Sequence, residues 1–421
     1  MEDAVEAHRT ELVVALCGSE KKHRQSFEKI RRYAEGIRNE SGKNGTPTFG
    51  GGRTFVFVDM KYDAHNREMI TDDDDMKVDV VLHKLSTLPP EAFGALLKWC
   101  EATSAKRRQK RLPPVVVIDP PNAARVVMKR STLAKALEGR PVPSLFLTPR
   151  SWFCSCGGGA LEPLGWRDTD STVTPDTTEG SCEWWITKTD LSTGPSYTHR
   201  MVVWQGPVPT NGIPQAVMKL LPSESQTYIV QKFFLSALPF VLKVYCVREY
   251  VAIRAVSAFS LLRALLDGYS SINSNREGFQ PVCIDSQKIF ANKDVWDQQN
   301  PQLAQHWQRY LIEGGEAHTQ CKAIAAQLSQ TLQLSLFGFD LLLLPKDLPS
   351  GNQPILESPI TAEAVGALLF EEKGVGSPTI LLRTAVPMVV DVNYFPGYAG
   401  MSEVERRITE MIESSVVSKD C

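Results

Sequence analysis

The chain has 421 residues, of which 43% are hydrophobic and 22% charged, and its formal net charge at pH 7 is −2. At roughly 100–200 residues per domain, this length predicts two or three domains. The near-zero net charge argues against a surface built for nucleic-acid binding, and apolar runs such as FGFDLLLLP and LPPVVVID are far too short to span a bilayer.

The first third of the chain alternates strand-like and helix-like stretches. Such alternation is typical of an α/β domain with a parallel sheet, which we expect to span residues 1–119. The predicted strands lie at 11–17, 53–60, 79–85 and 115–119, and helices are predicted over 25–37 and from Pro90 onward.

The rest of the chain predicts antiparallel sheets, an α+β pattern. We expect a central domain at 120–234, with strands at 183–188, 199–205 and 227–234. A C-terminal domain at 235–421 follows. It begins with a hairpin over 242–257, which turns near Arg248 and Glu249, and continues with helices over 314–333 and 402–417 and strands at 335–344 and 387–395.

Three oxygen-bearing side chains predict a metal site. Asp340 lies in the apolar strand FGFDLLLL, where a carboxylate is costly unless it is paired or bound to a cation. Asp391 and Asn393 are two residues apart in a strand, so their side chains share one face. Together the three suit Mg²⁺, which prefers oxygen ligands. A strand-end Asp that caps the following turn is the alternative for Asp391 taken alone.

Basic residues at strand ends are candidates for binding phosphate. Lys22 opens a helix directly after the first strand, where helix N–H groups collect anions, and Lys84 follows the third strand on the same edge of the sheet. Lys188 ends a strand as a point charge suited to phosphate. Lysines that extend along the surface are the alternative for each of these residues.

A series of short motifs then follows a fixed order, and it resembles the inositol-tetrakisphosphate 1-kinase family, also called the inositol 1,3,4-trisphosphate 5/6-kinases. The resemblance covers most of the chain apart from three insertions, near 155–180, 263–305 and 345–383. The motifs are Ser19-Glu20-Lys21-Lys22, His83-Lys84-Leu85, Asp119-Pro120 with Arg125 and Arg130-Ser131, Lys188-Thr189, Val230-Gln231-Lys232-Phe233, Lys243-Val244, Ser335-Leu336-Phe337-Gly338-Phe339-Asp340 and Asp391-Val392-Asn393-Tyr394-Phe395-Pro396-Gly397-Tyr398.

The resemblance implies an ATP-grasp architecture, in which an N-terminal parallel α/β domain precedes two sheet-bearing domains that clasp the nucleotide. It also implies roles for individual residues. Catalysis would fall to Lys188, His199 and Lys243; nucleotide binding to Arg125, Lys188, Gln231, Lys232, Phe233 and Ser257; Mg²⁺ binding to Asp340, Asp391 and Asn393; and inositol phosphate binding to Lys22, Lys84, His199, Lys243, Asn393 and Gly397.

One position departs from the family pattern. The family has Ala-His-Gly after Lys-Thr, where this chain has Ser192-Thr193-Gly194, so Thr193 stands in place of the histidine. His199 follows Gly194 one residue later than the family spacing. We expect His199 to approach the substrate phosphates, where a neighbouring anion would favour its charged form.

The sequence therefore predicts a kinase that transfers the γ-phosphate of ATP, with Mg²⁺, to a hydroxyl group of an inositol tris- or tetrakisphosphate. The alternatives are an ATP-grasp ligase that joins a carboxylate to an amine, and an inactive scaffold that binds inositol phosphates. We expect a monomer that binds neither nucleic acid nor membrane. The polar N-terminus and nine cysteines without a paired framework favour the cytoplasm, and the nucleus is a further compartment.

Overall fold

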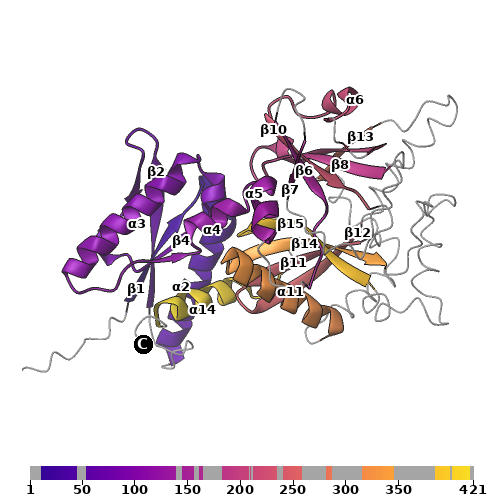
Figure 1. Cartoon of the computed structure of the whole chain (residues 1–421). Coiled ribbons are helices and arrows are strands. Elements are labelled where there is room, and N and C mark those ends of the chain that lie inside the picture. The colour runs from indigo at the N-terminus through magenta and orange to yellow at the C-terminus, as the bar shows by residue number, and fades with distance from the viewer. Residues whose placement is uncertain are drawn as a thin grey trace, which may run out of the picture. The chain divides into compact units, whose positions relative to one another are not determined.

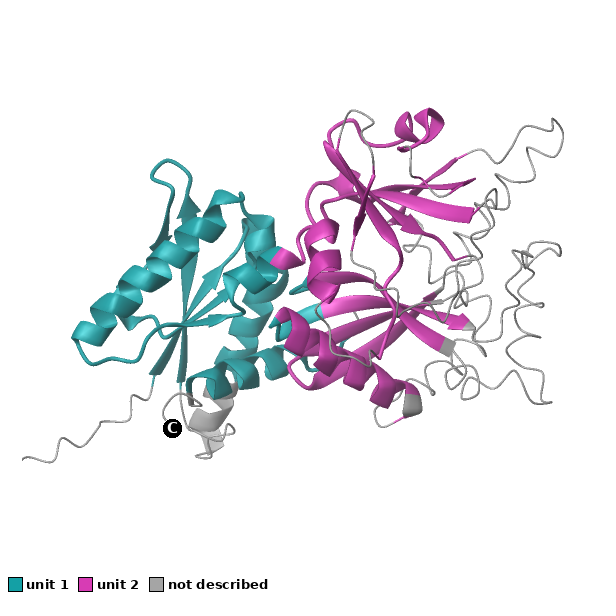
Figure 2. Ribbon diagram, viewed as in Figure 1, with its two compact units in different colours: residues 1–125, 333–337, 394–421 teal, residues 126–332, 338–393 magenta. Residues whose placement is uncertain are grey.

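The computed structural model divides the chain into two compact units (Figures 1 and 2). Unit 1 comprises Met1–Arg125, Gln333–Phe337 and Tyr394–Cys421, and unit 2 comprises Val126–Leu332 and Gly338–Asn393. The structure describes residues 11–44, 54–138, 145–155, 161–164, 183–207, 209, 212–234, 240–257, 281–286, 315–345, 385–398 and 401–417. Most residues of the three predicted insertions lie outside the described residues.

Unit 1 is built on a five-stranded sheet in the order β3-β2-β1-β4-β5. The three inner strand pairs are parallel, and β3 is an antiparallel edge strand. Strands β1 and β4 are buried almost throughout, which explains their continuous apolar sequences. The bounds are Glu11–Cys17 for β1, Thr54–Asp63 for β2, Glu68–Thr71 for β3, Val80–His83 for β4 and Val116–Ile118 for β5.

Helices complete unit 1. After β1 the chain turns at Gly18, where an added Cβ would lie 3.1 Å from the Phe27 ring, so any other residue would need a small shift of that ring. Ser19 then caps α1, because its hydroxyl accepts from the Lys22 N–H. Helix α14 packs on α2. The helices are α1 (Glu20–Lys22), a π-helical turn (His23–Phe27), α2 (Glu28–Asn44), α3 (Glu91–Gln109), α4 (Pro121–Val126) and α14 (Val404–Val417).

The first sheet of unit 2 has six strands in the order β13-β9-β8-β10-β6-β7, and every pair is antiparallel. One face carries a core of aromatic and aliphatic side chains that includes Trp152, Trp185 and Trp204. The opposite face carries a smaller apolar cluster around Ile186, Val203 and Ile284. The strands are β6 (Ser151–Ser155), β7 (Glu162–Leu164), β8 (Glu183–Thr189), β9 (Arg200–Gly206), β10 (Thr227–Lys232) and β13 (Val282–Asp285).

The second sheet of unit 2 has four strands in the order β12-β11-β14-β15. Strands β11 (Phe240–Val247) and β12 (Tyr250–Ser257) form the predicted hairpin, and Arg248 takes a positive φ of 51° in its two-residue turn. Helix α11 (Glu316–Leu332) contacts β12 and α5 (Arg130–Glu138). Strands β14 (Leu336–Pro345) and β15 (Ala385–Tyr394) each have one end in unit 1 and continue in unit 2.

The predicted fold class, α/β followed by an α+β part, is confirmed by these three sheets. The predicted domain boundaries remain a prediction, and the two compact units divide the chain differently. Residues 394–421, which we expected in the C-terminal domain, belong to unit 1. Within the described part of the chain, no helix is long and apolar enough to cross a membrane.

Candidate active site

A cavity of about 440 Å³ lies within unit 2 and takes side chains from both of its sheets. The six-stranded sheet contributes mainly through β8, β9, β10 and β13, and the four-stranded sheet through β11, β14 and β15. The lining residues are Arg130, Pro149, Ile186, Lys188, Ser192, His199, Met201, Gln231, Lys232, Phe233, Phe234, Val241, Lys243, Ile284, Ser286, Asp340, Leu342, Val390, Asp391 and Asn393.

The cavity has an apolar part and a charged part. Ile186 and Lys188 share one face of β8, because they are two residues apart in the strand. Ile186 belongs to the apolar cluster with Ile284, and Met201 and Phe233 pack against it. Lys188 continues the same face into the charged part. Such a combination of apolar walls and few converging polar groups is typical of a small-molecule site.

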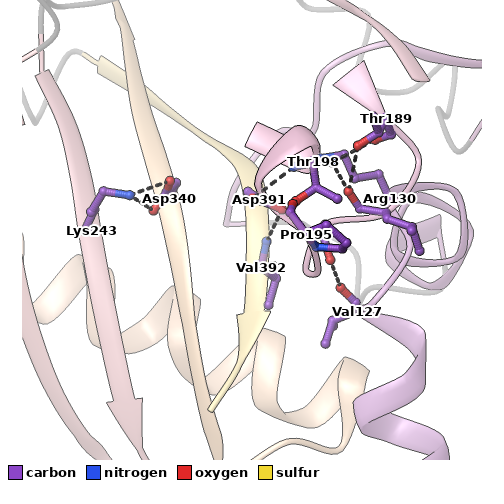
Figure 3. Close-up of polar contacts among 11 residues, drawn as sticks. Val127, Arg130, Thr189, Pro195, Thr198, Lys243, Asp340, Asp391 and Val392 are labelled. Atoms are coloured by element: carbon purple, nitrogen blue, oxygen red, sulfur yellow. Dashed lines mark hydrogen bonds and ion pairs between the residues drawn. The ribbon is translucent and has the colours of Figure 1, made fainter. Parts of the chain in front are cut away.

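All three predicted metal ligands line the charged part. Asp340 comes from β14, and Asp391 and Asn393 come from β15, the neighbouring strand. The Lys243 ammonium group on β11 contacts both oxygens of Asp340, at 2.9 and 3.1 Å (Figure 3). Burial raises the pKa of Asp340, and Asp391 raises it further, while Lys243 opposes the rise. The two carboxylates therefore repel one another electrostatically within one cavity.

The donor chemistry of this cavity fits Mg²⁺. Within the described residues, no three side chains of His, Cys, Asp or Glu gather into a metal site. Magnesium nevertheless needs only one or two carboxylates when water and phosphate oxygens supply the rest of its coordination. Asp340 and Asp391 would provide the carboxylates, and the Asn393 amide oxygen would add a neutral ligand. A divalent cation would also relieve the repulsion between the two carboxylates.

Arg130 and Lys188 bring positive charge to the same cavity. The Arg130 guanidinium donates to the carbonyl oxygens of Thr189 and Leu191 at 2.8 and 2.6 Å, and its Nη2 lies 3.8 Å from Asp391 Oδ2 (Figure 3). Lys188 is buried, and its burial and the neighbouring Arg130 lower its pKa to about 8, against the opposing effect of the carboxylates. Arg130 is therefore held in place by the protein itself, and Lys188 is buried beside it.

Arg130 lines the cavity, and it belongs to the same motif as Arg125, which the resemblance implied as a nucleotide ligand. Arg125 is an exposed residue of α4 in unit 1, and its role in nucleotide binding stays a prediction. Arg130 is held because its backbone N–H also donates to the Asp190 carbonyl.

His199 also lines the cavity and is half-buried at the end of a 3₁₀ turn (Ser196–His199). Burial and Arg130 lower its pKa in the ligand-free protein, while Asp285 and Asp391 oppose this. The charged form expected beside a substrate phosphate stays a prediction. Thr193 is not a lining residue. Its hydroxyl is buried and has no hydrogen-bond partner within the described residues.

The three residues predicted as the nucleotide hinge all line the cavity. Gln231 and Lys232 end β10, and Phe233 follows them. The Lys232 ammonium pairs with Glu183 at 2.6 Å, which directs its charge toward β8. Ser257 ends β12, but its side chain lies outside the described residues.

Lys22 and Lys84 meet in unit 1, and with Tyr394 and Phe395 they form what we name the basic cluster. The Lys22 ammonium lies 4.1 Å from the centre of the Phe395 ring, and the Lys84 ammonium donates to the Tyr394 carbonyl oxygen. Burial lowers the pKa of Lys22 to about 8, and burial together with Lys22 lowers that of Lys84 to about 7. Gly397, also in unit 1, is exposed, and no atom lies within 4 Å of an added Cβ there.

A buried network holds the two strands that carry the predicted metal ligands. The Tyr394 hydroxyl lies 3.1 Å from the carbonyl oxygens of His83 and Ile118 and accepts from the Asp119 N–H. Asp119 Oδ2 accepts from the N–H groups of Ser335 and Leu336, at 2.8 Å each. This anchor network of Asp119, Tyr394 and His83 therefore fixes one end each of β14 and β15 to the sheet of unit 1.

Comparisons with known proteins give structural similarity alone. No family model matches the sequence, and no curated protein matches it. Several solved structures align along nearly the whole chain. One is the macrocyclase MdnC from Microcystis aeruginosa, which has 10% identity, a TM-score of 0.41 and coverage of 97% of this chain and 99% of that one. D-Alanine-D-alanine ligase from Helicobacter pylori has 8% identity, a TM-score of 0.39 and coverage of 96% and 98%.

A third, an ATP-grasp ligase associated with a ribosomally made peptide in Chryseobacterium gregarium, has 10% identity, a TM-score of 0.39 and coverage of 97% of both chains. Identities and scores this low carry no argument about activity. The assignment of fold rests instead on the order and direction of the strands described above. The architecture is that of the ATP-grasp fold. It joins an N-terminal parallel α/β sheet to two further sheets, with a polar cavity between those two.

Proposed function

We propose that this protein is a kinase that transfers the γ-phosphate of ATP, with Mg²⁺, to a hydroxyl group of an inositol polyphosphate. The observation that carries the proposal is the composition of the cavity in unit 2, where apolar walls, two buried cations and an oxygen-rich ligand set converge. The motif series of the inositol-tetrakisphosphate 1-kinase family adds the substrate class.

The apolar part and the charged part of the cavity together support the binding of ATP. Phe233, Ile186 and Ile284 offer apolar surface to a purine ring. Lys188 and Arg130 offer positive charge to the phosphates, and a bound phosphate would raise the pKa of Lys188 again, because an opposite charge favours the protonated form. The magnesium ion would supply charge neutralisation between the phosphates and the two carboxylates.

The basic cluster in unit 1 supports an inositol polyphosphate as the substrate that accepts the phosphate. A substrate that carries several phosphates needs several cations, and Lys22 and Lys84 offer two, of which Lys22 lies close enough to lower the affinity of Lys84 for a proton. Burial of these lysines makes their unliganded state costly, so a polyanion that pairs with them gains free energy. Tyr394 links the two sets of residues along the chain. It contacts Lys84 of the basic cluster, and in the sequence it directly follows Asn393, which lines the cavity.

This site would act mainly by positioning and charge. Phosphoryl transfer passes through a loose transition state that demands little covalent chemistry from the protein. Lys188 and Arg130 would hold the nucleotide phosphates, and His199 would donate or accept a hydrogen bond at its imidazole in the same cavity. The Lys243–Asp340 ion pair keeps the Asp340 carboxylate oriented in the absence of ligand.

A ligase that activates a carboxylate and joins it to an amine is the second candidate. The similar structures named above from Helicobacter pylori and Chryseobacterium gregarium are ligases, and such an enzyme would use the same cavity. A ligase that acts on neutral or singly charged substrates gives no reason for the buried lysines of the basic cluster. This cluster is what favours the kinase.

Incubation of the purified chain with MgATP and a panel of acceptors separates these activities. The panel contains inositol tris- and tetrakisphosphates, free amino acids and short peptides. We expect ADP to form only with an inositol phosphate, and the product to be heavier by one phosphate group. ADP formation that requires an amino acid or peptide would support the ligase, and binding of inositol phosphate without turnover would support a scaffold.

A further inference from the structure

Two neighbouring polar side chains, Ser151 and Gln231, occupy the otherwise apolar part of the cavity wall. They are paired across strands β6 and β10, and both are buried, with exposed fractions of 2% and 7%. Gln231 is a lining residue, whereas Ser151 stands behind it. A buried polar pair on an apolar wall is costly unless its hydrogen bonds are made, so its geometry indicates what it does.

The single proton of the Ser151 hydroxyl fixes the orientation of the Gln231 amide. Ser151 Oγ donates to the carbonyl oxygen of Pro149, at 2.9 Å. Having used its only proton, it must act as acceptor toward Gln231, whose amide group lies 3.1 Å away. The amide nitrogen therefore faces Ser151, and the amide oxygen Oε1 faces the other way.

The Gln231 oxygen is available to a ligand. Across the described residues it accepts no hydrogen bond, and it is not one of the buried polar atoms that lack a partner, so it is open to the cavity. Its position is set by the strand register, in which Gln231 pairs with Ile186 and Ile229 pairs with Lys188. The oxygen thus lies at the apolar part of the cavity, one pleat away from the cations.

We propose that Gln231 Oε1 accepts a hydrogen bond from the exocyclic amine of a purine base, and that Ser151 selects 6-aminopurines over 6-oxopurines by holding that oxygen toward the base. The inference rests on the proposed nucleotide site and adds its base specificity. Gln231 would contact the base directly, and Ser151 would act as a positioning residue through Gln231.

The selectivity follows from the fixed amide. A 6-oxo group would place its oxygen against Oε1, which leaves two acceptors unpaired away from water. The amide cannot rotate to offer its nitrogen instead, because Ser151 would then lose its donor and face a second acceptor. Sites that are built to hydrogen-bond one group reject analogues without it more strongly than apolar pockets reject an extra methylene.

Equilibrium dialysis of the full chain with Mg²⁺ and either ATP or inosine triphosphate tests this. The second nucleotide carries oxygen in place of the amine. We expect the wild-type chain to bind ATP at least about tenfold more tightly, because a hydrogen bond and an unpaired acceptor are exchanged. In Ser151→Ala the amide can turn, so the ratio should fall to within about threefold of unity, as ATP weakens and inosine triphosphate strengthens.

Two further variants separate selectivity from folding. Gln231→Leu keeps the volume but removes the oxygen, so it should weaken ATP about tenfold, while inosine triphosphate, which no longer faces an opposing acceptor, should bind at least as tightly as to the wild-type chain. Tyr228→Phe removes a buried hydroxyl from the same strand on the opposite face, where it bonds to the carbonyl oxygens of Pro222 and Ser225, and should leave the ratio unchanged. Melting temperatures confirm that each variant is folded.

The outcomes distinguish this inference from the function on which it rests. If the wild-type chain binds both nucleotides equally, or if Ser151→Ala keeps the full preference for ATP, the inference is wrong and the nucleotide site stands. If neither nucleotide binds, the proposed function fails as well. A change of ratio in Tyr228→Phe equal to that in Ser151→Ala would show that the effect is structural only.

Discussion

Asp340 and Asp391 introduce two negative charges into one cavity, and among the described residues only Asp340 has a close ammonium partner. Lys243 contacts both oxygens of Asp340, whereas Asp391 has Arg130 at 3.8 Å. Burial and mutual repulsion raise the pKa of Asp340. Buried carboxylates with a raised pKa are common at functional sites. Stability alone would favour a better-paired carboxylate or an apolar side chain at such a position.

Asp391→Asn should abolish turnover while the fold remains. The amide has the same size, but it removes the negative charge that a magnesium ion would use, and several kcal/mol of transition-state stabilisation depend on that ion. We expect kcat to fall at least about a thousandfold. Asp72→Asn is the control, because that carboxylate is exposed and pairs with Lys61 in unit 1. Near-normal kcat in Asp391→Asn at ordinary Mg²⁺ would contradict the assignment of the metal ligands.

Lys84→Ala and Lys22→Ala should weaken the inositol phosphate far more than ATP. A lost charge-assisted contact costs roughly 1.5–3 kcal/mol, so the Kd for the inositol phosphate should rise about 10- to 150-fold. Lys61→Ala removes an exposed lysine of the same unit and serves as the control. Separate titrations with each ligand measure the effect. If ATP affinity collapses and inositol phosphate affinity holds, the basic cluster belongs to the nucleotide.

His83 should make unit 1 sensitive to acid. Its imidazole is fully buried, and burial lowers its pKa from 6.5 to about 4, so the folded state stays neutral where the unfolded state gains a proton. Between about pH 6.5 and pH 4 the unfolded chain therefore binds more protons, and stability falls as pH falls. The loss amounts to about 1.4 kcal/mol per pH unit over this window.

His83→Gln tests this, because glutamine can still donate to the Asp119 carbonyl oxygen, which His83 Nε2 contacts at 2.7 Å. Urea unfolding at about pH 7 and about pH 4.5 should show a smaller loss of stability in the variant than in the wild-type chain. Equal losses would show that other groups control the acid response.

At the scale of elements, the anchor network decides where β14 and β15 lie. Asp119 Oδ2 accepts from two consecutive backbone N–H groups where β14 begins, and Tyr394 holds the end of β15. Phe395 follows with a positive φ of 43°, which is uncommon for a bulky residue, and its N–H donates to the Leu336 carbonyl oxygen. The surrounding bonds therefore hold a strained turn directly after the strand that carries Asp391 and Asn393.

Asp119→Ala should destabilise unit 1 by about 2–4 kcal/mol, because it leaves two N–H groups without an acceptor. Asp119→Asn keeps one acceptor oxygen and should cost less. Hydrogen exchange of the amides in β1 and β4 measures the change within unit 1. Unchanged protection of these amides in Asp119→Ala would contradict a stabilising role for the network.

The sequence predicted most elements because their signals are local. Continuous apolar runs gave β1, β4 and β14, and the spacing of Asp391 and Asn393 placed both side chains in one cavity. Strands β3 and β13, four residues each, lacked the length for a recognisable pattern. Helix α2 runs to Asn44, although a helix was predicted only to residue 37, because its last turns are polar and rich in glycine and serine.

The lining residues from β9 and β13 depend on long-range packing. Met201 and Ile284 reach the cavity through the pairing of β9 with β13, which joins residues about eighty positions apart. Ser151 carried no signal in the sequence, because its importance comes from the strand register with Gln231. Local patterns cannot report such pairings.

At the scale of the whole molecule, the proposed kinase uses each unit for one substrate. The cavity with its oxygen-rich ligands lies in unit 2, and the basic cluster lies in unit 1. Strands β14 and β15 belong to both units, because one unit gives way to the other between residues 337 and 338 and between residues 393 and 394. A ligase and a kinase with this architecture would bind the same nucleotide, and they differ in the group that receives the phosphate.

The fate of the γ-phosphate of ATP therefore tests the central claim most directly. The full chain is incubated with Mg²⁺, ATP labelled with ³²P in the γ-position and a mixture of inositol tris- and tetrakisphosphates, and the products are separated by anion-exchange chromatography. We predict that the label moves from ATP into a more highly phosphorylated inositol, and that Asp391→Asn prevents this transfer. Label that appears only as inorganic phosphate, and only when an amino acid or peptide is added, would contradict the kinase and identify a ligase.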